Sequence, residues 1–232
     1  REQVRGAKMS IENNILRIRE EIAKTCQKYN RNPEEVKLLA VSKTFPISAI
    51  LAAHNAGQLD FAESRVQEFL PKQKQAPELN WHFIGHLQSN KINKIVNMNI
   101  LLHSVDSLEL AEKLSERLLV VNKTMDVLLQ VNIDKDPAKF GFTPAGLRQN
   151  IEKIIQLKGI NVKGLMTIGT VHDNPKAARV TFANLRGLRD ALNEVSGCNF
   201  NELSMGMSSD YKEAIAEGAT VVRVGTAIFG VR

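Results

Sequence analysis

The feature of this sequence that most restricts its fold is an alternation of short apolar runs with amphipathic stretches, which begins near residue 36 and continues to the C-terminal end. Each apolar run has the length of a buried strand, and each stretch between two runs has the apolar spacing of a helix. Runs such as "LLAV" and "VLLQV" fit strands that are buried on both faces. The alternation therefore predicts an α/β protein with a parallel sheet covered by helices.

The number of elements favours a closed barrel. The expected strands span residues 36–42, 60–63, 81–85, 100–105, 126–133, 161–168, 202–205 and 220–224. The expected helices span residues 9–29, 46–56, 65–73, 89–97, 107–120, 144–157, 175–194 and 209–217. Eight strands preceded by one additional helix predict a (β/α)₈ TIM barrel that occupies residues 1–232 as a single domain. A doubly wound sheet is the alternative, although no G-x-G-x-x-G sequence follows an expected strand.

Composition excludes several classes of protein. The longest apolar runs are far shorter than the roughly 18 residues of a membrane span, and no secretory signal peptide is visible at the start. The two cysteines form no CxxC motif, so we expect a reduced, cytoplasmic protein. The net charge of +6 could attract nucleic acid or a phosphorylated small molecule. Aromatic residues make up only 5% of the chain, so nucleic acid is the weaker alternative.

Helix-start signals follow several of the expected strands. These signals are Ser64 with Gln67, Asp106 with Glu109, Thr143 with Pro144, Ser89, and Ser208. In a barrel they all lie at the carboxyl ends of the strands, the end where barrel active sites are built.

Lys43 follows the first strand at this same end. One interpretation is a strand-end lysine that extends into solvent. The other is an amine held in the barrel mouth. Desolvation and nearby cations there would lower the pKa of the lysine and allow it to form a Schiff base. The choice depends on whether other strand ends supply a matching ligand site.

The last two strands supply groups that suit an anion. Arg223 lies near the end of strand eight, and Gly225 and Thr226 follow it with backbone amides that can bind phosphate oxygens. Ser204 and Ser208 offer hydroxyls after strand seven, where a helix begins. A plain strand-to-helix turn and a simple helix cap are the structural alternatives. An amine opposite an anion site fits a carbonyl ligand that carries a phosphate, such as pyridoxal 5′-phosphate (PLP).

The sequence resembles the PLP homeostasis family over nearly its whole length, from Ile11 to Arg232. The resemblance rests on "LLAVSKT" (38–44), "WHFIGHLQSNK" (81–91), "GLM" (164–166), "LSMGMSSD" (203–210) and "VRVGTAIFG" (222–230). It implies a PLP-binding barrel similar to the N-terminal domain of alanine racemase. The family often has Ala-Ile-Pro after "GLM", whereas Thr167-Ile168-Gly169 stands here.

The resemblance also implies the cofactor-binding residues. It implies Lys43 as the Schiff-base lysine, Arg223 near the pyridine nitrogen, and a phosphate site at Ser208, Gly225 and Thr226 with Ser204 nearby. It places Met166, Met205, His82 and His86 around the cofactor. The family motif Phe-Gly-Glu-Asn reads Phe61-Ala62-Glu63-Ser64 here, so Ser64 stands where a longer Asn is usual.

Three functions follow as hypotheses, of which the first is preferred. The protein carries or buffers PLP for vitamin B6 homeostasis without robust turnover, it is a PLP-dependent racemase or related enzyme, or it binds nucleic acid or protein through its basic surface. Racemisation needs an acid/base group on each face of the substrate carbon. In alanine racemase a tyrosine from a domain after the barrel is the second group, and we expect no such domain after Arg232. Tyr211 is the only conceivable substitute, and we expect it to pack beside the helix instead.

Partners and metals complete the expectations. PLP is the expected ligand, PLP-dependent apoenzymes are its candidate recipients, the chain is expected to be a monomer, and no membrane partner is expected. His82 and His86 lie four residues apart, which invites a zinc interpretation. Phe83 stands where H-E-x-x-H has its Glu, and Gly85 favours a loop, so no metal is expected.

Overall fold

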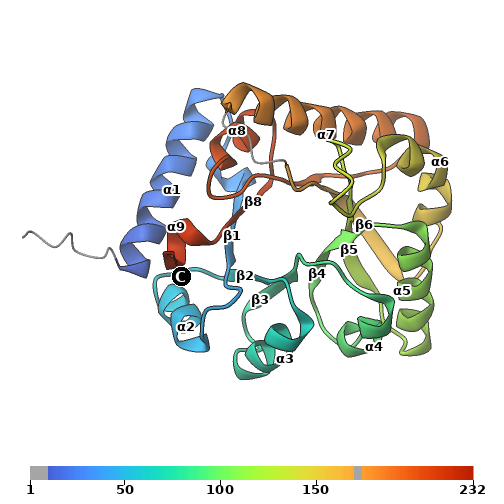
Figure 1. The fold of residues 1–232 in the computed structure, drawn as a ribbon, viewed down its shortest axis with the longest axis horizontal. Helices are drawn as coiled ribbons and strands as arrows, with labels where there is room; N and C mark the ends of the chain where they lie inside the picture. The colour runs from blue at the N-terminus through green and yellow to red at the C-terminus, as the bar shows by residue number, and fades with distance from the viewer. Residues whose placement is uncertain (1–9, 170–173, 232) are drawn as a thin grey trace, which may run out of the picture.

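Eight parallel strands form a closed barrel in the computed structural model, which describes residues 10–169 and 174–231. Each strand pairs with the next one along the sequence, and β8 pairs with β1 to close the barrel. Figure 1 shows the helices surrounding the strands. The predicted (β/α)₈ barrel is confirmed, and the doubly wound alternative is wrong.

The elements follow one another in the expected order. The strands are β1 (Lys37–Val41), β2 (Asp60–Glu63), β3 (Asn80–Phe83), β4 (Leu101–Val105), β5 (Met125–Gln130), β6 (Ile160–Met166), β7 (Glu202–Ser204) and β8 (Val221–Val224). The α-helices are α1 (Ile11–Lys28), α2 (Ile47–Asn55), α3 (Val66–Gln75), α4 (Ile92–Ile95), α5 (Leu108–Val120), α6 (Pro144–Ile155), α7 (Pro175–Ser196), α8 (Tyr211–Ala216) and α9 (Thr226–Phe229). Two short 3-10 turns, η1 (Pro33–Glu35) and η2 (Ser89–Lys91), precede β1 and α4.

The strands separate the apolar layer under the helices from the barrel interior, which is why β1 is apolar from Leu38 to Val41. In β1, Leu38 and Ala40 belong to the large core between the strands and the helices. Leu39 and Val41 belong to a small cluster inside the barrel, with one residue each from β2 and β8. Because successive side chains of a strand point to opposite faces, one strand serves both cores.

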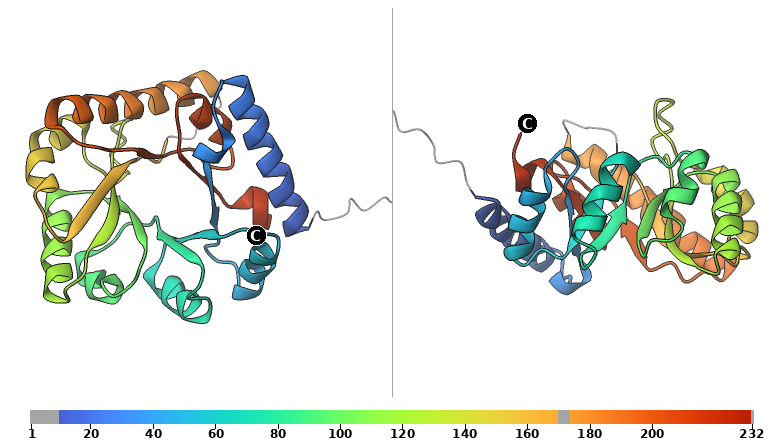
Figure 2. Two further views of the ribbon diagram at one scale, coloured as in Figure 1. Left: turned by 180° about the vertical axis from the view of Figure 1, so that it is seen from behind. Right: turned by 90° about the horizontal axis from the view of Figure 1, so that it is seen from below.

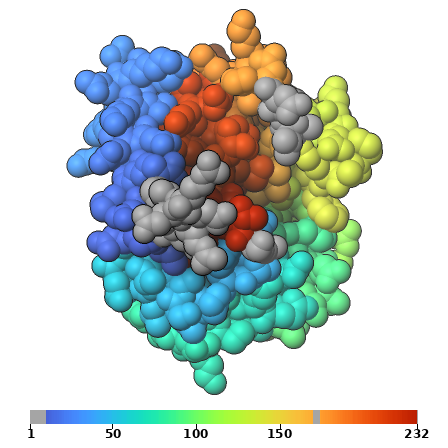
Figure 3. Space-filling view, turned by 60° about the vertical axis from the view of Figure 1, so that its left-hand side comes forward, coloured from blue at the N-terminus to red at the C-terminus, as the bar shows by residue number. Residues whose placement is uncertain are grey.

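The additional helix α1 packs on the outside of the barrel. Its residues Ile15 and Ile18 are fully buried, and the Asn14 side chain donates a hydrogen bond to the Ile228 carbonyl at 2.9 Å. Helix α1 therefore lies against α8 and α9, near the end of the sequence. Figures 2 and 3 show this contact as blue N-terminal residues beside red C-terminal ones.

Some predicted boundaries are wrong. The expected helix 89–97 divides into η2 and α4, the expected strand 126–133 ends at Gln130, and α9 was not predicted. The strand ends there because a loop returns to it. Gln130 Nε2 donates to Phe140 O, and Asn132 N donates to Phe142 O.

The predicted helix starts vary in accuracy. Thr143 caps α6, and its hydroxyl accepts a hydrogen bond from the Gly146 amide, as predicted. The cap of α5 is Ser107 instead of Asp106, whose carboxylate lies 2.7 Å from His86 Nδ1. Ser64, Ser89 and Ser208 do not cap helices, because α3, η2 and α8 begin after Arg65, Gln88 and Asp210.

Within residues 10–169 and 174–231, no helix has both the length and the apolar character needed to cross a membrane. Cys26 and Cys198 are free thiols, as their spacing predicts.

Candidate functional site

Barrel closure brings the segment after β1 beside the segment after β8. Ala40 is paired with Val224, so the two strands end at the same level. A Cβ atom on Gly225 would lie only 3.2 Å from the Val41 carbonyl oxygen, which shows how closely the two segments approach. Lys43 therefore emerges beside Gly225 at the carboxyl-end rim of the barrel, where its side chain is exposed. Of the residues predicted around Lys43, Gly225 lies beside the same strand end.

The segments after β7 and β8 are joined by a hydrogen bond. Ser208 Oγ accepts from the Gly225 amide at 3.2 Å, which fixes the Ser208 hydroxyl next to the start of α9. Helix α9 begins at Thr226, which is exposed, and the amides of a first helical turn have no partner within the helix. The hydroxyl and these amides are groups that can bind an anion, and the phosphate site at Ser208, Gly225 and Thr226 stays a prediction.

Glycine is required at position 206 in the segment after β7. Gly206 has a φ of +92°, and a Cβ atom there would lie 2.5 Å from Ala214 Cβ on α8. The segment can therefore lie directly on α8, and this close approach holds the following residues, including Ser208, near the rim.

Arg223 is buried inside the barrel below the rim. Its Nη1 donates to Ser204 Oγ and its Nη2 donates to the Thr167 carbonyl, both at 2.8 Å. Burial lowers the pKa of the Arg223 guanidinium to about 10, although Asp210 opposes that shift, so the group stays protonated at neutral pH. Ser204 was predicted beside the phosphate segment. The structure places it deeper, as a partner of the guanidinium.

A row of hydrogen bonds continues from Ser204 across the barrel interior. His103 Nδ1 lies 2.8 Å from Ser204 Oγ, and His103 Nε2 lies 2.9 Å from His82 Nδ1. His82 Nε2 lies 3.1 Å from Asp60 Oδ1. The row therefore joins Arg223 to Asp60, at the opposite end of β2 from the rim.

The protonation of this row follows from the acceptors at its ends. Burial raises the pKa of the Asp60 carboxyl, but hydrogen bonds from His82 and Lys37 outweigh burial and leave that pKa below its usual value. The ionised Asp60 only accepts, so His82 Nε2 carries a hydrogen. Burial, aided by the nearby His82 and Arg223, holds the pKa of His103 well below its usual value, so His103 is neutral. As a neutral ring with both nitrogens in hydrogen bonds, His103 donates through one nitrogen and accepts through the other, and so links Ser204 to His82.

The structure does not bring His82 to the rim. It lines a polar cavity at the amino ends of the strands, together with Asp60, Asn80 and Asn199. The interpretation of His82 as a rim residue is therefore wrong. His82 lies on β3 and points inward near the opposite end of the barrel, because the rim lies beyond the end of its strand at Phe83.

His86 and Ser64 do lie at the rim. The His86 ring stacks on Phe140, with 3.7 Å between ring centroids, and both His86 and Ser64 line a small pocket with Lys91. A Cβ atom on Gly85 would lie 1.9 Å from the Ser64 carbonyl oxygen, so glycine allows this approach. Among the described residues, no group of three or more His, Cys, Asp or Glu side chains is arranged to hold a metal ion.

The two predicted methionines have different places. Met166 ends β6, level with Ser204, and is fully buried outside the large core cluster. Met205 is the residue after the end of β7 and is part of the large core between strands and helices. The prediction that Met205 surrounds the ligand site is therefore not supported, since its side chain packs against the helices.

Sequence reasoning missed His103 and the carboxylates near Lys43. His103 had a visible signal, because it is a polar residue in the middle of the apolar run "LLHSV". Glu63 had a similar signal, because it is a charged residue at the end of a buried strand. The sequence could not identify Lys72 as its partner, because Lys72 lies on the following helix.

The chain matches the family described as alanine racemase, N-terminal domain, over residues 11–232. The pyridoxal phosphate homeostasis protein of Synechocystis is 45% identical over 203 residues, covering 86% of this chain and 93% of the relative. The corresponding protein of Aquifex aeolicus is 40% identical, covering 94% of this chain and 96% of the relative.

Solved structures agree with these sequence matches. PipY of Synechococcus elongatus, with PLP bound, is 37% identical with a TM-score of 0.85, covering 95% of this chain and all of PipY. An alanine racemase of Clostridium difficile has a TM-score of 0.77 at 17% identity, covering 94% of this chain and 56% of the racemase. At that identity the racemase supports the barrel fold alone.

Proposed function

Because the chain belongs to the pyridoxal phosphate homeostasis protein family, we propose that it binds PLP at the rim, carries or buffers it, and thereby maintains vitamin B6 homeostasis. The observation that carries this proposal is the closure of β1 on β8. It places an exposed amine, Lys43, beside the hydroxyl and amides at Ser208, Gly225 and Thr226. The PLP-bound relative PipY supports the choice of ligand.

The residues at the rim fit the chemistry of PLP. Gly225 lies so close to β1 that a side chain would meet the Val41 carbonyl, and this close packing holds the start of α9 beside the end of β1. The Ser208 hydroxyl and the first amides of α9 suit a phosphate, and the buried Arg223 supplies a cationic donor beneath. The donor set is therefore one for an anionic ligand with a carbonyl group.

Each residue has a distinct proposed task. PLP supplies an aldehyde carbon, which forms a C=N bond with an unprotonated lysine amine and releases water. Lys43 provides that amine, and Ser208 with the amides of Gly225 and Thr226 binds the phosphate. Arg223 stays protonated and donates a hydrogen bond toward the pyridine nitrogen. A ring nitrogen held in this way remains unprotonated, which makes the ring a weaker electron sink.

We propose that the protein does not turn over amino acids at an appreciable rate. The chain has two tyrosines, and neither faces Lys43. The Tyr211 hydroxyl donates to Glu21 on α1, and Tyr29 packs beneath Arg179. An exposed Lys43 that neither tyrosine faces suits a protein that releases its ligand.

The remaining proposals concern assembly and recipients. The 232 residues act as one PLP-binding domain, the chain works as a cytoplasmic monomer, and PLP-dependent apoenzymes receive the PLP. Sedimentation of the loaded protein at increasing concentration tests the monomer, since a rise in mass contradicts it.

Absorbance spectroscopy with borohydride tests the ligand and its lysine. Adding PLP should give a visible band that borohydride fixes covalently, and peptide mass spectrometry should find the adduct on Lys43. Lys43→Ala should lose the band and keep its far-ultraviolet circular dichroism, whereas Lys91→Ala at the same rim should behave as the native protein. A reduced adduct on another lysine contradicts the assignment.

Proton exchange tests the absence of turnover. The loaded protein is incubated with L-alanine in deuterium oxide, and the α-proton is followed by NMR. We expect no multiple-turnover exchange. Exchange that depends on Lys43 would favour a racemase or a related enzyme instead.

A further inference from the structure

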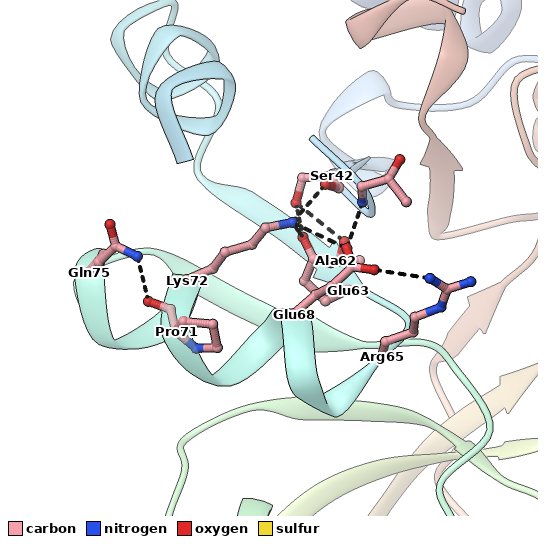
Figure 4. A network of polar contacts seen from close by, with 9 residues as sticks. Ser42, Ala62, Glu63, Arg65, Glu68, Pro71, Lys72 and Gln75 are labelled. Atoms are coloured by element: carbon pink, nitrogen blue, oxygen red, sulfur yellow. Dashed lines mark hydrogen bonds and ion pairs between the residues drawn. The ribbon is translucent and has the colours of Figure 1, made fainter. Parts of the chain in front are cut away.

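Lys43 lies between two residues whose backbones are held by side chains of β2 and α3. Ser42 comes directly before it and Thr44 directly after it. Figure 4 shows the polar contacts on the α3 side, where Lys72, Glu63 and Glu68 converge on this segment.

On the Ser42 side, the contacts are buried. Lys72 Nζ donates to the Ser42 carbonyl at 3.0 Å and to Glu63 Oε1 at 2.7 Å. The Ser42 hydroxyl donates to the same Glu63 oxygen at 2.7 Å. Glu63 is fully buried and Lys72 nearly so, which makes this an ion pair inside the protein that fixes both the carbonyl and the hydroxyl of Ser42.

On the Thr44 side, one carboxylate holds the backbone. Glu68 Oε2 accepts from the Thr44 amide at 2.7 Å. This hydrogen bond is the main reason that the pKa of the Glu68 carboxyl is below its usual value. Lys72 Nζ also lies 3.7 Å from Glu68 Oε2, so the contacts on the Ser42 side and those on the Thr44 side share one cation.

Thr44 adopts an unfavourable backbone conformation. Its φ is +67°, in the left-handed region that β-branched residues rarely occupy. Such a conformation persists only when surrounding contacts hold it, and it occurs often at functional sites. The Glu68 contact to the Thr44 amide holds it here, together with a turn hydrogen bond from the Phe45 amide to the Ser42 carbonyl.

We propose that Glu68 and the Glu63–Lys72 pair are positioning residues, which fix the backbone on both sides of Lys43 and so orient its amine toward the rim segment of Ser208 and Gly225. The proposal rests on the proposed function, because it concerns the speed with which Lys43 captures PLP. These residues do not touch the ligand. They act through Ser42 and Thr44.

Glu68 offers the sharper test, because it is partly exposed and its loss leaves no buried charge unpaired. Glu68→Met removes the acceptor of the Thr44 amide. Glu68→Gln keeps an amide oxygen that can still accept from it. Arg65→Met is the matched control, since Arg65 contacts Glu68 Oε1 at 3.3 Å and its side chain is 70% exposed.

The first measurement needs no PLP. Amide hydrogen exchange of Thr44 should be slow in the native protein, at least tenfold faster in Glu68→Met, and slow again in Glu68→Gln and Arg65→Met. An unprotected Thr44 amide in the native protein, or equal exchange in Glu68→Met, overturns the proposal whether or not PLP binds.

The second measurement follows the rate at which PLP forms its covalent adduct on Lys43. We expect adduct formation to be at least tenfold slower in Glu68→Met, to recover most of its rate in Glu68→Gln, and to match the native rate in Arg65→Met. The unfolding midpoints of the three variants should not follow this order, which separates the effect from a loss of stability. A native rate in Glu68→Met, or a loss that Glu68→Gln does not restore, overturns the proposal. If the native protein forms no adduct on Lys43, the proposed function fails, and the exchange measurement still decides the fixation of the segment.

The Glu63–Lys72 half is tested with both charges removed together. Glu63→Gln with Lys72→Met keeps an acceptor for the Ser42 hydroxyl and loses the donor to the Ser42 carbonyl, together with the Lys72 contact to Glu68. We expect a several-fold slower capture of PLP. A folded double variant that captures PLP at the native rate removes this pair from the proposal, and a variant that fails to fold assigns the pair to stability instead.

Discussion

Ser204 joins the two halves of the buried polar row, so its truncation should be costly. In Ser204→Ala the Arg223 guanidinium and the His103 ring each lose a partner that lies at 2.8 Å, and both remain buried. A hydrogen bond with a charged donor contributes about 1.5–3 kcal/mol and one between neutral groups about 0.5–1.5 kcal/mol. We therefore expect the free energy of unfolding to fall by about 2–4 kcal/mol.

The assay is urea unfolding of the ligand-free protein. Trp81, the single tryptophan, is buried beside Phe61 and Phe69, so its fluorescence should report the loss of the barrel, with far-ultraviolet circular dichroism as the second probe. For a chain of this size each kcal/mol lowers the melting temperature by about 2–4 °C, so a fall of about 4–16 °C is expected.

Ser48→Ala is the matched control, because Ser48 is exposed on α2, and surface substitutions of this kind change the free energy of unfolding by about 0.5 kcal/mol or less. A loss in Ser204→Ala no larger than in the control would refute the reasoning. It would mean that Arg223 and His103 find equivalent partners when the hydroxyl is removed.

Three further predictions follow from the same structure. Below pH 6.5, the usual pKa of an unfolded histidine, the unfolded chain binds a proton that the buried His103 does not, because its pKa in the fold is depressed. The free energy of unfolding should therefore fall as pH drops from about 6.5 to 5, by up to about 1.4 kcal/mol per pH unit, and should fall less in His103→Asn. Equal slopes in the two proteins would contradict this. Ser208→Ala should weaken PLP binding about tenfold, because a hydrogen bond to a charged group contributes about 1.5–3 kcal/mol, and an unchanged affinity in a titration would exclude Ser208 from the phosphate site. Gly164→Ala places a Cβ atom 1.9 Å from the Glu202 carbonyl oxygen and should lower the free energy of unfolding by about 3 kcal/mol or more. Gly187 lies on helix α7, where a Cβ atom would meet nothing within 4 Å, so Gly187→Ala should stabilise the protein by about 0.5–1 kcal/mol. A mild effect at Gly164 would show that β6 and β7 can separate without cost.

The barrel could be predicted because its signal is local. Strand sequences such as Leu38–Val41 are apolar on both faces, and the helices carry apolar stripes of their own. The order of elements then left only two architectures, and the number of strands favoured the correct one. The exact ends of elements were less predictable, since the cap of α5 is decided by whether Asp106 bonds to the helix or to His86.

The candidate site was predictable only where a residue lies at a strand end. Lys43, Ser208 and Gly225 follow β1, β7 and β8, and all parallel strands of a barrel end at the same rim. Their nearness therefore follows from topology, without any knowledge of side-chain contacts.

The tertiary structure alone decided depth and direction. Ser204 and Met205 are adjacent in the sequence, yet one partners Arg223 in the interior and the other packs against the helices. His82 precedes the rim by only a few residues, yet its ring bonds to Asp60 near the opposite end. The physical reason is that register and facing are set by pairing with strands distant in sequence, and a one-residue change of register exchanges the two faces of a strand. The sequence by itself determined which strands exist and which residues follow them, whereas closure of β1 on β8 decided which of those residues meet.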